Sequence, residues 1–385
     1  MAVGGTGGGP SAPRAGSFGR VKERRGSTVE VESLEEFDAR VAAGARSLSG
    51  WHLQGLDLRE RGLALRGLDA AGALFLGCEL EPADEQSLRA RGALVFPIVP
   101  GIPFDAYRAS LYTAEELYAG LDTSYEETLD ARVYAWSRQE PSLDRSLTQA
   151  LHDHAIDDAL LELVKDRRLV GVMGGHAVTR GSAPYADAAR LAGELTRAGL
   201  LVATGGGPGA MEAANLGAYL ARQPPAVLDE ALDLLAAAPS FVPSVQAWAS
   251  AALEVRERWP GGAHSLGIPT WHYGHEPPNA FATAIAKYFR NAIREAVLLH
   301  AASAGIVFLP GAAGTVQEVF QDACENYYAD ASSVAPMVLV GREHWTRTLP
   351  VWPLLESLAR ERHMAGHVHL VDDVSEVPAL LASAG

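Results

Sequence analysis

The chain is poor in lysine and in cysteine. Only three of its 32 basic residues are lysines, namely Lys22, Lys165 and Lys287, and the others are arginines. Few candidates therefore exist for any reaction that needs a lysine Schiff base. The two cysteines, Cys78 and Cys324, are too few for a disulfide framework, and they lack the spacing of a zinc site.

The chain also lacks a surplus of positive charge and a long hydrophobic run. Its 385 residues include 47 acidic side chains, which leave a formal charge of −15. This balance argues against binding to nucleic acid or to an anionic membrane. The long uncharged stretch 296–316 contains His300, Pro310 and several glycines, a pattern typical of a helix end, a strand and a turn. With no apolar signal segment at its start, we expect a cytoplasmic protein.

Changes in composition divide the chain into three parts. Residues 1–29 are rich in glycine and are predicted to be a disordered tail. Residues 30–165 are predicted to form an accessory or oligomerisation domain of short strands and helices. In this part, Ser33–Glu36 and Thr113–Glu116 have the pattern of capping boxes, which start helices. After Trp51, leucines recur at short intervals and indicate short strands or a few coils of a β-solenoid.

Residues 166–385 alternate between short apolar runs and helical patterns. Runs such as RLVGVMGG, LLVATGGG, GIVFLP and PMVLVG are separated by segments with helical periodicity, including one predicted over 281–300. This alternation predicts an α/β domain with a Rossmann-like, doubly wound parallel sheet. A helical insertion is expected over 222–262. In such sheets, ligands bind beyond the carboxyl ends of the strands.

Three of the predicted strand-to-helix turns are rich in glycine. They are GVMGGH at 171–176, TGGGPGAME at 204–212 and PGAAGTVQE at 310–318. Glycine lets backbone N–H groups approach an anion, and the following helix N-terminus adds partial positive charge. Three such turns at one edge of a sheet favour a phosphate site over turns that serve packing alone.

Common cofactor motifs are absent from these turns. The chain has no G-x-x-x-x-G-K-[ST] sequence, and the turn at Gly205 does not follow G-x-G-x-x-G. A P-loop nucleotide site and a dinucleotide cofactor are therefore not expected, and no cofactor is predicted. His272 and His275 lie three residues apart in a loop with glycine and proline, where a structural role is commoner than metal binding. No metal site is predicted.

Four charged residues stand out in and before the third turn. On the predicted helix 281–300, Lys287, Arg290 and Arg294 fall on one stripe, and the helix leads to the strand before Pro310. Glu318 ends the turn, although Thr315-x-x-Glu318 also has the pattern of a capping box. From spacing alone, capping is the commoner role for Glu318.

The two motifs GGGPGAMEAAN (205–215) and PGAAGTVQE (310–318), separated by NAIRE (291–295), resemble the "LONELY GUY" (LOG) family. This family contains phosphoribohydrolases and bacterial nucleotide 5′-monophosphate nucleosidases, and the resemblance covers about 166–385. It implies that Glu318 and Arg294 are the catalytic pair, with Arg290 as the alternative arginine. Ala312 replaces the second glycine of the family's P-G-G. The resemblance also implies a homodimer or a higher homo-oligomer.

Together, the turns and the resemblance imply hydrolysis of a nucleoside 5′-monophosphate to free base and ribose 5-phosphate. One alternative is a nucleotide-binding or sensor protein without turnover, which would use the same phosphate site. A second is a pyridoxal-phosphate lysine decarboxylase, for which Lys287 is the only candidate lysine. The predicted substrate-binding residues are Gly174, Gly175, Gly205, Gly206, Gly207, Gly209, Met211, Glu212, Gly311, Gly314 and Thr315.

Overall fold

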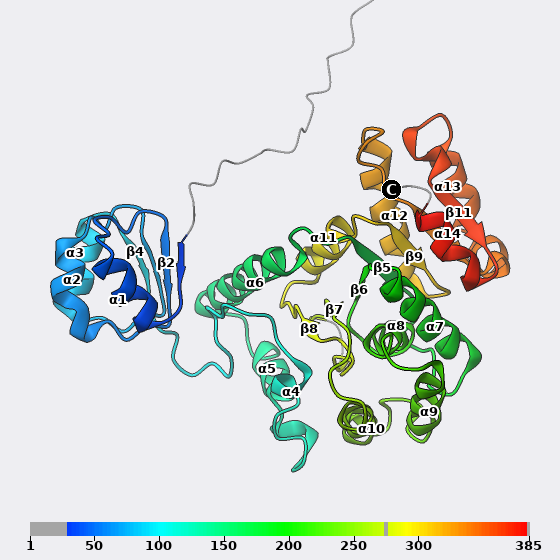
Figure 1. The fold of residues 1–385 in the computed structure, drawn as a ribbon, viewed down its shortest axis with the longest axis horizontal. Helices are drawn as coiled ribbons and strands as arrows, with labels where there is room; N and C mark the ends of the chain where they lie inside the picture. Colours follow the sequence, from blue (N-terminus) through cyan, green and yellow to red (C-terminus); the bar gives the residue numbers. More distant parts are fainter. Residues whose placement is uncertain (1–28, 273–275, 383–385) are drawn as a thin grey trace, which may run out of the picture. The chain divides into compact units, whose positions relative to one another are not determined.

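The computed structural model describes residues 29–272 and 276–382, and it separates the chain into two compact units between Ile98 and Val99. The predicted tail, 1–29, lies outside the described residues except for Val29, which begins the first strand. Each unit contains its own parallel sheet (Figure 1).

The smaller unit repeats a strand and a helix. Its parallel sheet has the order β1-β2-β3-β4, and Leu53, Phe75 and Val95 pair across neighbouring strands and lie in the core. Because a helix lies between each pair of strands, this unit is an α/β repeat, not an all-β solenoid. The elements are β1 (Val29–Val31), α1 (Leu34–Ala42), β2 (Trp51–Gln54), η1 (Arg59–Arg61), α2 (Gly62–Gly67), β3 (Leu74–Leu76), α3 (Pro82–Ala90) and β4 (Leu94–Phe96).

Both predicted capping boxes outside the third glycine turn are confirmed at their N-caps. The Ser33 hydroxyl accepts a hydrogen bond from the Glu36 N–H at 3.2 Å, at the start of α1. The Thr113 hydroxyl accepts one from the Glu116 N–H, also at 3.2 Å, at the start of α4 (Ala114–Leu117). Each bond satisfies an N–H group that would otherwise lack a partner.

The segment 99–165 belongs to the larger unit, although the sequence placed a boundary at 165/166. Tyr112 and Ile285 exchange backbone hydrogen bonds of 3.0 and 2.8 Å. The Asp153 carboxylate accepts the N–H groups of Phe289 and Arg290 at 2.9 and 3.1 Å. These contacts join residues more than 100 positions apart, which composition and periodicity do not reveal. The segment contains η2 (Tyr125–Glu127), α5 (Leu129–Ser137) and α6 (Leu143–Val164).

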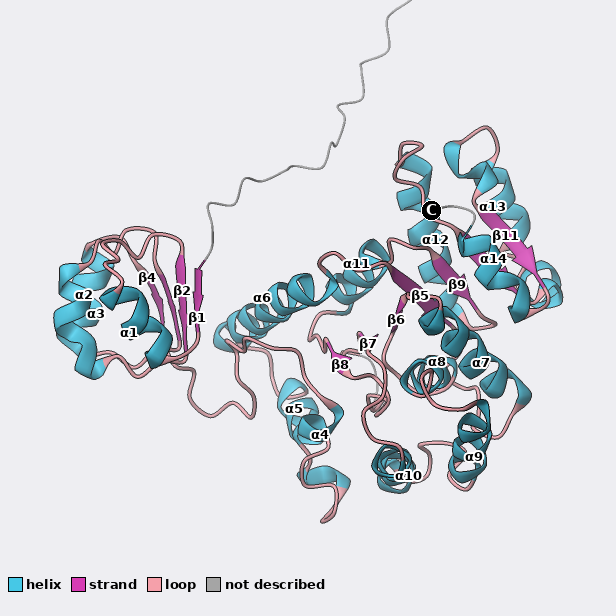
Figure 2. Ribbon diagram, in the orientation of Figure 1, coloured by secondary structure: helices cyan, strands magenta, loops and turns pink. Residues whose placement is uncertain are grey.

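The larger unit has the predicted α/β fold with a doubly wound parallel sheet. Its seven strands have the order β11-β10-β9-β5-β6-β7-β8, and every pair in the sheet is parallel (Figure 2). The chain runs outward from β5 to β8 and then restarts at β9 on the other side of β5. The strands are β5 (Leu169–Met173), β6 (Leu201–Thr204), β7 (Ser265–Gly267), β8 (Ala284–Ile285), β9 (Ile306–Phe308), β10 (Met337–Val340) and β11 (Val368–Val371).

The helices of the larger unit pack in two groups, one next to β6 and one that follows α11 along the chain. The pair α7 and α8 pack together and against β6, and α12 packs between α11 and α13. A side chain at Gly217 would lie 1.8 Å from the Ala189 carbonyl oxygen, so the close approach of α7 and α8 needs glycine there. The helices are α7 (Ala183–Arg197), α8 (Ala210–Tyr219), α9 (Pro225–Ala236), α10 (Val245–Arg258), α11 (Asn291–Ala301), α12 (Ala313–Tyr328), α13 (Trp352–Ala359) and α14 (Val377–Ala382), with short η3 (His344–Thr348), η4 (His363–Gly366) and η5 (Val374–Glu376).

The predicted helix over 281–300 is wrong in its first half. Residues 284–285 form β8, and α11 begins only at Asn291. The stripe of Lys287, Arg290 and Arg294 therefore does not exist. Lys287 is 1% exposed, and its ammonium group donates to the Asp130 carboxylate at 2.5 Å. This contact with α5, from a distant part of the sequence, holds 281–290 in an extended path.

Candidate functional site

The three glycine turns meet at the point where the sheet changes direction. β5 lies between β9 and β6, so the turns after these three adjacent parallel strands share one edge. The Gly175 N–H donates to the Pro310 carbonyl at 3.1 Å, and the Ala210 N–H donates to the Gly175 carbonyl at 3.1 Å. The crevice between β5 and β9 is the switch point at which doubly wound sheets bind ligands.

The turn after β6 requires glycine at two positions. Gly206 has φ +72°, and a side chain there would lie 2.5 Å from the Pro269 ring. Gly209 has φ +74°, and a side chain there would lie 2.5 Å from the Gly175 carbonyl oxygen. Both backbone conformations favour glycine, and both positions leave no room for another residue. Packing alone therefore accounts for glycine at these two positions, and their role in phosphate binding stays a prediction.

Two buried asparagines that sequence reasoning missed hold this turn. The Asn279 N–H donates to the Gly206 carbonyl at 2.8 Å, and its side-chain amide donates to the Gly207 carbonyl at 3.2 Å. Asn215, on α8, accepts from Asn279 at 3.0 Å and from the Thr204 hydroxyl at 2.7 Å. Asn215 lay inside the quoted motif GGGPGAMEAAN, which was the available signal. Asn279 carried none.

Met211 packs on this turn from α8. Side chains built at Gly205 and Gly207 would lie 2.7 Å from its sulfur and 3.0 Å from its terminal methyl group, respectively. Of the predicted ligand residues, Met211 therefore supports the turn through van der Waals contact. Gly174 is equally enclosed, since a side chain there would lie 2.9 Å from Ala210.

The turn after β9 leads directly into α12. A side chain at Gly311 would lie 2.1 Å from the Thr315 hydroxyl, whereas Gly314 faces open space. Ala312 is the N-cap residue, with φ −113°, a conformation that any residue adopts. Replacing the family's glycine with Ala312 therefore leaves the backbone of the turn unstrained.

Glu318 does not cap α12. The helix begins at Ala313, and its N-cap makes no side-chain hydrogen bond, so Thr315 and Glu318 lie within the first turns. The capping alternative for Thr315–Glu318 is wrong, because the helix starts three residues earlier than that pattern requires. Glu318 is free to face the crevice.

Glu318 and Arg294 come together from α12 and α11. Arg294 Nη1 lies 3.5 Å from Glu318 Oε1, and each side chain is 13% exposed. Burial raises the pKa of Glu318 to about 7; the Arg294 charge partly offsets this rise, and Glu295 adds to it. Near neutral pH, the carboxyl group can therefore either carry charge or hold a proton.

The hydrogen-bonding capacity of the Arg294 guanidinium group is not fully used by the described residues. Its Nε atom is buried and makes no hydrogen bond to any described residue, and the buried Nη1 has the 3.5 Å ion-pair contact with Glu318. Nη1 also lies 3.6 Å from the position of a side-chain carbon built at Gly205. Buried donors without acceptors are costly unless a ligand satisfies them. An anion between the turn at Gly205 and Arg294 would do so.

The structure separates Arg294 from the alternative, Arg290. Arg290 precedes α11 and is exposed, and the described contact it makes with Asp153 is through its backbone N–H. Only Arg294 of the two pairs with Glu318. A neighbour that sequence reasoning missed, Glu295, accepts hydrogen bonds from Asn291 at 2.6 Å and from Gln317, joining α11 to α12 behind the pair.

Glu212, predicted to bind substrate, lines a cavity beside the turn after β6, but a buried arginine engages its carboxylate. Its carboxylate is bound by the Arg180 guanidinium at 2.5 and 3.0 Å, and both side chains are 1% exposed. Arg180 Nη1 also donates to the carbonyls of Ala238 and Trp248 at 3.2 and 3.0 Å. The pair thus attaches the insertion to α8, a contact that the motif alone could not show.

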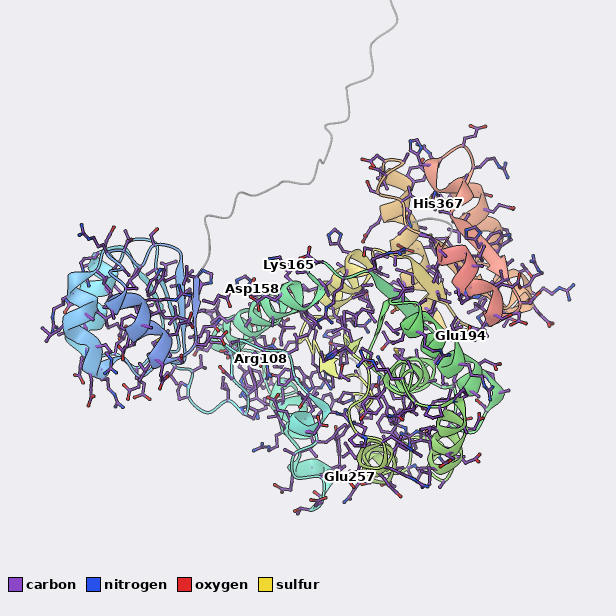
Figure 3. The ribbon with its side chains drawn as sticks, in the orientation of Figure 1. Arg108, Asp158, Lys165, Glu194, Glu257 and His367 are labelled. Carbon is purple, nitrogen blue, oxygen red and sulfur yellow. The ribbon has the colours of Figure 1, made fainter. Side chains whose placement is uncertain are left out.

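Neither described lysine is placed for Schiff-base chemistry at the edge of the sheet that carries the glycine turns. Lys287 is buried in its ion pair with Asp130, and its ammonium group lies 5.1 Å from the centre of the Trp271 ring. Burial lowers the pKa of Lys287, and Asp130 opposes that shift. Lys165 follows α6 and is exposed (Figure 3). Neither belongs to a glycine turn, and Lys22 lies outside the described residues.

The described part of the chain has neither a metal-binding cluster nor a membrane-spanning helix. Across residues 29–272 and 276–382, no three His, Cys, Asp or Glu side chains are grouped to hold a metal ion. His275 lies outside those ranges, so the structural role predicted for His272 and His275 stays a prediction. Within the same ranges, no helix is long and apolar enough to cross a membrane.

Comparisons with known proteins give similarity of structure only. No family model matches the chain, and no curated protein matches it. Among solved structures, it is similar to a molybdenum cofactor binding protein from Rippkaea orientalis, with 16% identity and a TM-score of 0.38 over 57% of this chain and 98% of that one. It is also similar to the molybdenum cofactor carrier protein from Chlamydomonas reinhardtii, with 18% identity and a TM-score of 0.34 over 57% and 98%.

Proposed function

We propose that this chain hydrolyses the N-glycosidic bond of nucleoside 5′-monophosphates. The observation that carries the proposal is the buried pair Glu318–Arg294 beside the glycine turns, where the Nε donor of Arg294 has no acceptor among the described residues. A phosphorylated ligand supplies that acceptor. The resemblance of the two glycine motifs to the LOG family supports the same pair.

Arg294 and the glycine turns form the anion-binding end of the proposed site. The planar guanidinium group offers Nε and Nη1 to phosphate oxygens, and guanidinium binds phosphate well because its donors are fixed in one plane. The turn at Gly311 lies at the N-terminus of α12, which adds partial positive charge. These local groups act against the net charge of −15.

Glu318 supplies the chemical group. As the bond between the base nitrogen and C1′ breaks, its electron pair leaves with the nitrogen and positive charge develops on the ribose. The Glu318 carboxylate stabilises that charge and accepts a proton from the attacking water, whose oxygen bonds to C1′. The departing base takes up a proton. A pKa of about 7 suits a general base at neutral pH.

Base release tests this proposal. The purified chain is incubated with a panel of nucleoside monophosphates, and free base is followed by chromatography. We expect release by the wild type and a loss of about 10²-fold or more in Glu318→Gln. Glu325→Gln is the matched control, because Glu325 is exposed on the same helix. Equal turnover in wild type and Glu318→Gln would remove Glu318 from the chemistry.

Binding without turnover is the second candidate function. Ala312, in place of the family's second glycine, adds a methyl group at the entrance to α12, where an anion would sit. A sensor or carrier would keep the anion-binding end and lose hydrolysis. Tight binding of a monophosphate with no base released over hours would favour this function and exclude the enzyme.

A further inference from the structure

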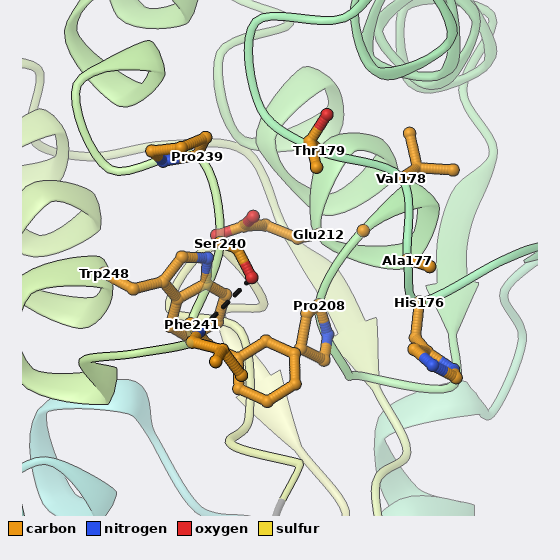
Figure 4. Close-up of a pocket in the computed structure, with 12 residues that line it drawn as sticks. His176, Ala177, Val178, Thr179, Pro208, Glu212, Pro239, Ser240, Phe241 and Trp248 are labelled. Carbon is orange, nitrogen blue, oxygen red and sulfur yellow. Dashed lines mark hydrogen bonds between the residues drawn. The ribbon is translucent and has the colours of Figure 1, made fainter.

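A cavity that sequence reasoning did not anticipate lies beside the glycine turns. Its volume is about 240 Å³, and it lies between the β5–α7 loop, the turn after β6 and the insertion (Figure 4). Phe241 and Trp248 lie on one side and Val178 on the other, with Pro208 between them (Figure 4). Most of this lining is apolar or aromatic. The insertion that supplies Phe241 is absent from the short LOG pattern.

No free cation reaches this cavity. Arg180 lies against the Trp248 ring, 4.7 Å from its centre. Its Nε and Nη2 atoms bind Glu212, and Nη1 binds two backbone carbonyls of the insertion. Since these donors are all engaged, Arg180 offers none of them to a phosphate. The polar groups that remain in its wall include the Thr179 and Ser240 hydroxyls and the His176 imidazole.

Two parts of the cavity wall adjoin the proposed site along the chain. Pro208 and Gly209, which line it, directly follow the turn Gly205–Gly207 that adjoins Arg294. His176 also lines it and follows Gly175, which is bonded to Pro310. A ligand bound at Arg294 that extends past Pro208 would place an uncharged planar group in the cavity.

We propose that this cavity holds the heteroaromatic base of the nucleotide, with Phe241 as the residue that packs on the base. This inference rests on the proposed function. A cavity of about 240 Å³ is smaller than the ~300–1,000 Å³ of a site for a whole drug-sized ligand, so it suits one planar part of a larger molecule. Aromatic side chains favour stacked or edge contacts with such rings.

Paired titrations test this assignment. Calorimetry measures the binding of adenosine, guanosine and cytidine 5′-monophosphates, and of ribose 5-phosphate, which lacks a base. The Glu318→Gln background prevents turnover. We expect Phe241→Ala to weaken binding of at least one monophosphate about tenfold or more and to leave ribose 5-phosphate within about twofold. Phe241→Trp restores binding, and Arg294→Ala weakens both kinds of ligand.

Two further variants separate the base site from general damage. Ala177→Trp places a large ring in the cavity and should abolish monophosphate binding without affecting ribose 5-phosphate. Tyr328→Ala, at an aromatic residue 81% exposed on α12, should change neither. If Phe241→Ala and Ala177→Trp both bind monophosphates like the parent, the base lies elsewhere and the assignment is overturned, while base release still stands. If the wild type binds no phosphorylated ligand and releases no base, the proposed function fails and the base site with it.

Discussion

Glu318 is the residue whose surroundings matter most to the proposed chemistry. It lies one and a half turns into α12, 13% exposed, and faces a single guanidinium group at 3.5 Å. A closer, bidentate contact with Arg294 would hold the carboxylate fully charged. Burial instead raises its pKa to about 7, with Arg294 lowering that pKa and the nearby Glu295 raising it. One side chain can thus exchange a proton near neutral pH.

The first prediction at this scale concerns the pH dependence of base release. Only the ionised Glu318 stabilises positive charge on the ribose, so kcat/KM should rise with pH through about 7 and then level off. Below about pH 6, the rate should fall about tenfold for each pH unit. Initial rates with one monophosphate measure this profile, and Glu325→Gln should reproduce it. A flat profile between about pH 5 and 8 would contradict the role of the carboxylate.

The raised pKa of Glu318 also predicts that ionising this residue lowers the free energy of unfolding. Folding raises the pKa of Glu318 from 4.5 to about 7, so between these values the folded state binds more protons than the unfolded state. Stability therefore falls as pH rises through this window, by about 3 kcal/mol in total. Glu318→Gln should be more stable than the wild type at about pH 8, and the difference should vanish below about pH 4.5.

Urea unfolding at both pH values measures this difference. The midpoint and slope give the free energy of unfolding of each variant. Glu325→Gln again serves as the control and should show a smaller change, because Glu325 is more exposed and burial raises its pKa less than that of Glu318. A Glu318→Gln variant that is less stable than the wild type at pH 8 would show that the charged carboxylate is not held against an energetic cost.

At the scale of elements, the insertion depends on a buried ion pair. Arg180 joins Glu212 on α8 to the carbonyls of Ala238 and Trp248, which flank the loop carrying Phe241. Removing one partner leaves the other charge buried. Glu212→Gln should therefore lower the free energy of unfolding by about 3–5 kcal/mol and weaken monophosphate binding with it.

A double variant checks that prediction. Arg180→Met combined with Glu212→Gln removes the unpaired charge, so it should be more stable than Glu212→Gln alone. Chemical denaturation of the four proteins in the cycle gives the coupling energy. Independent, additive effects of the two substitutions would show that the pair does not stabilise the insertion.

The glycine motifs indicated the turns of the site but not what surrounds them. Gly206 and Gly209 could be recognised in the sequence because they belong to a cluster of glycines after an apolar run. The structure explains that cluster, since the positive φ values and close contacts at both positions admit only glycine. The start of α11 could not, because 281–290 has helical periodicity and is held extended by the contact of Lys287 with distant Asp130. Phe241 carried no local signal at all. Its position depends on Arg180, some 60 residues earlier in the chain.

At the scale of the whole molecule, the α/β class with a doubly wound parallel sheet could be predicted, because apolar runs and helical segments alternate over most of 166–385. The division of the chain could not. Asp130 illustrates why, since its carboxylate accepts hydrogen bonds from Trp271 at 2.9 Å, from Tyr125 at 2.7 Å and from Lys287. In the sequence, Asp130 is one acidic residue among 47.

These contacts predict where the chain can be shortened. A chain of residues 99–385 keeps every site residue and the contacts of Asp130, Asp153 and Tyr112 with 271–290, so it should fold and release base within about twofold of the full-length rate. A chain of residues 166–385 loses all three partners. It leaves Lys287 buried without its counter-ion and uncovers Trp271 and Phe289, so it should be insoluble or unfold without cooperativity. Circular dichroism melting and base release, measured side by side, compare the two. If a chain of residues 166–385 folded cooperatively and released base, the segment 99–165 would not be needed for folding or activity. It would then be part of an accessory domain, as its sequence predicted.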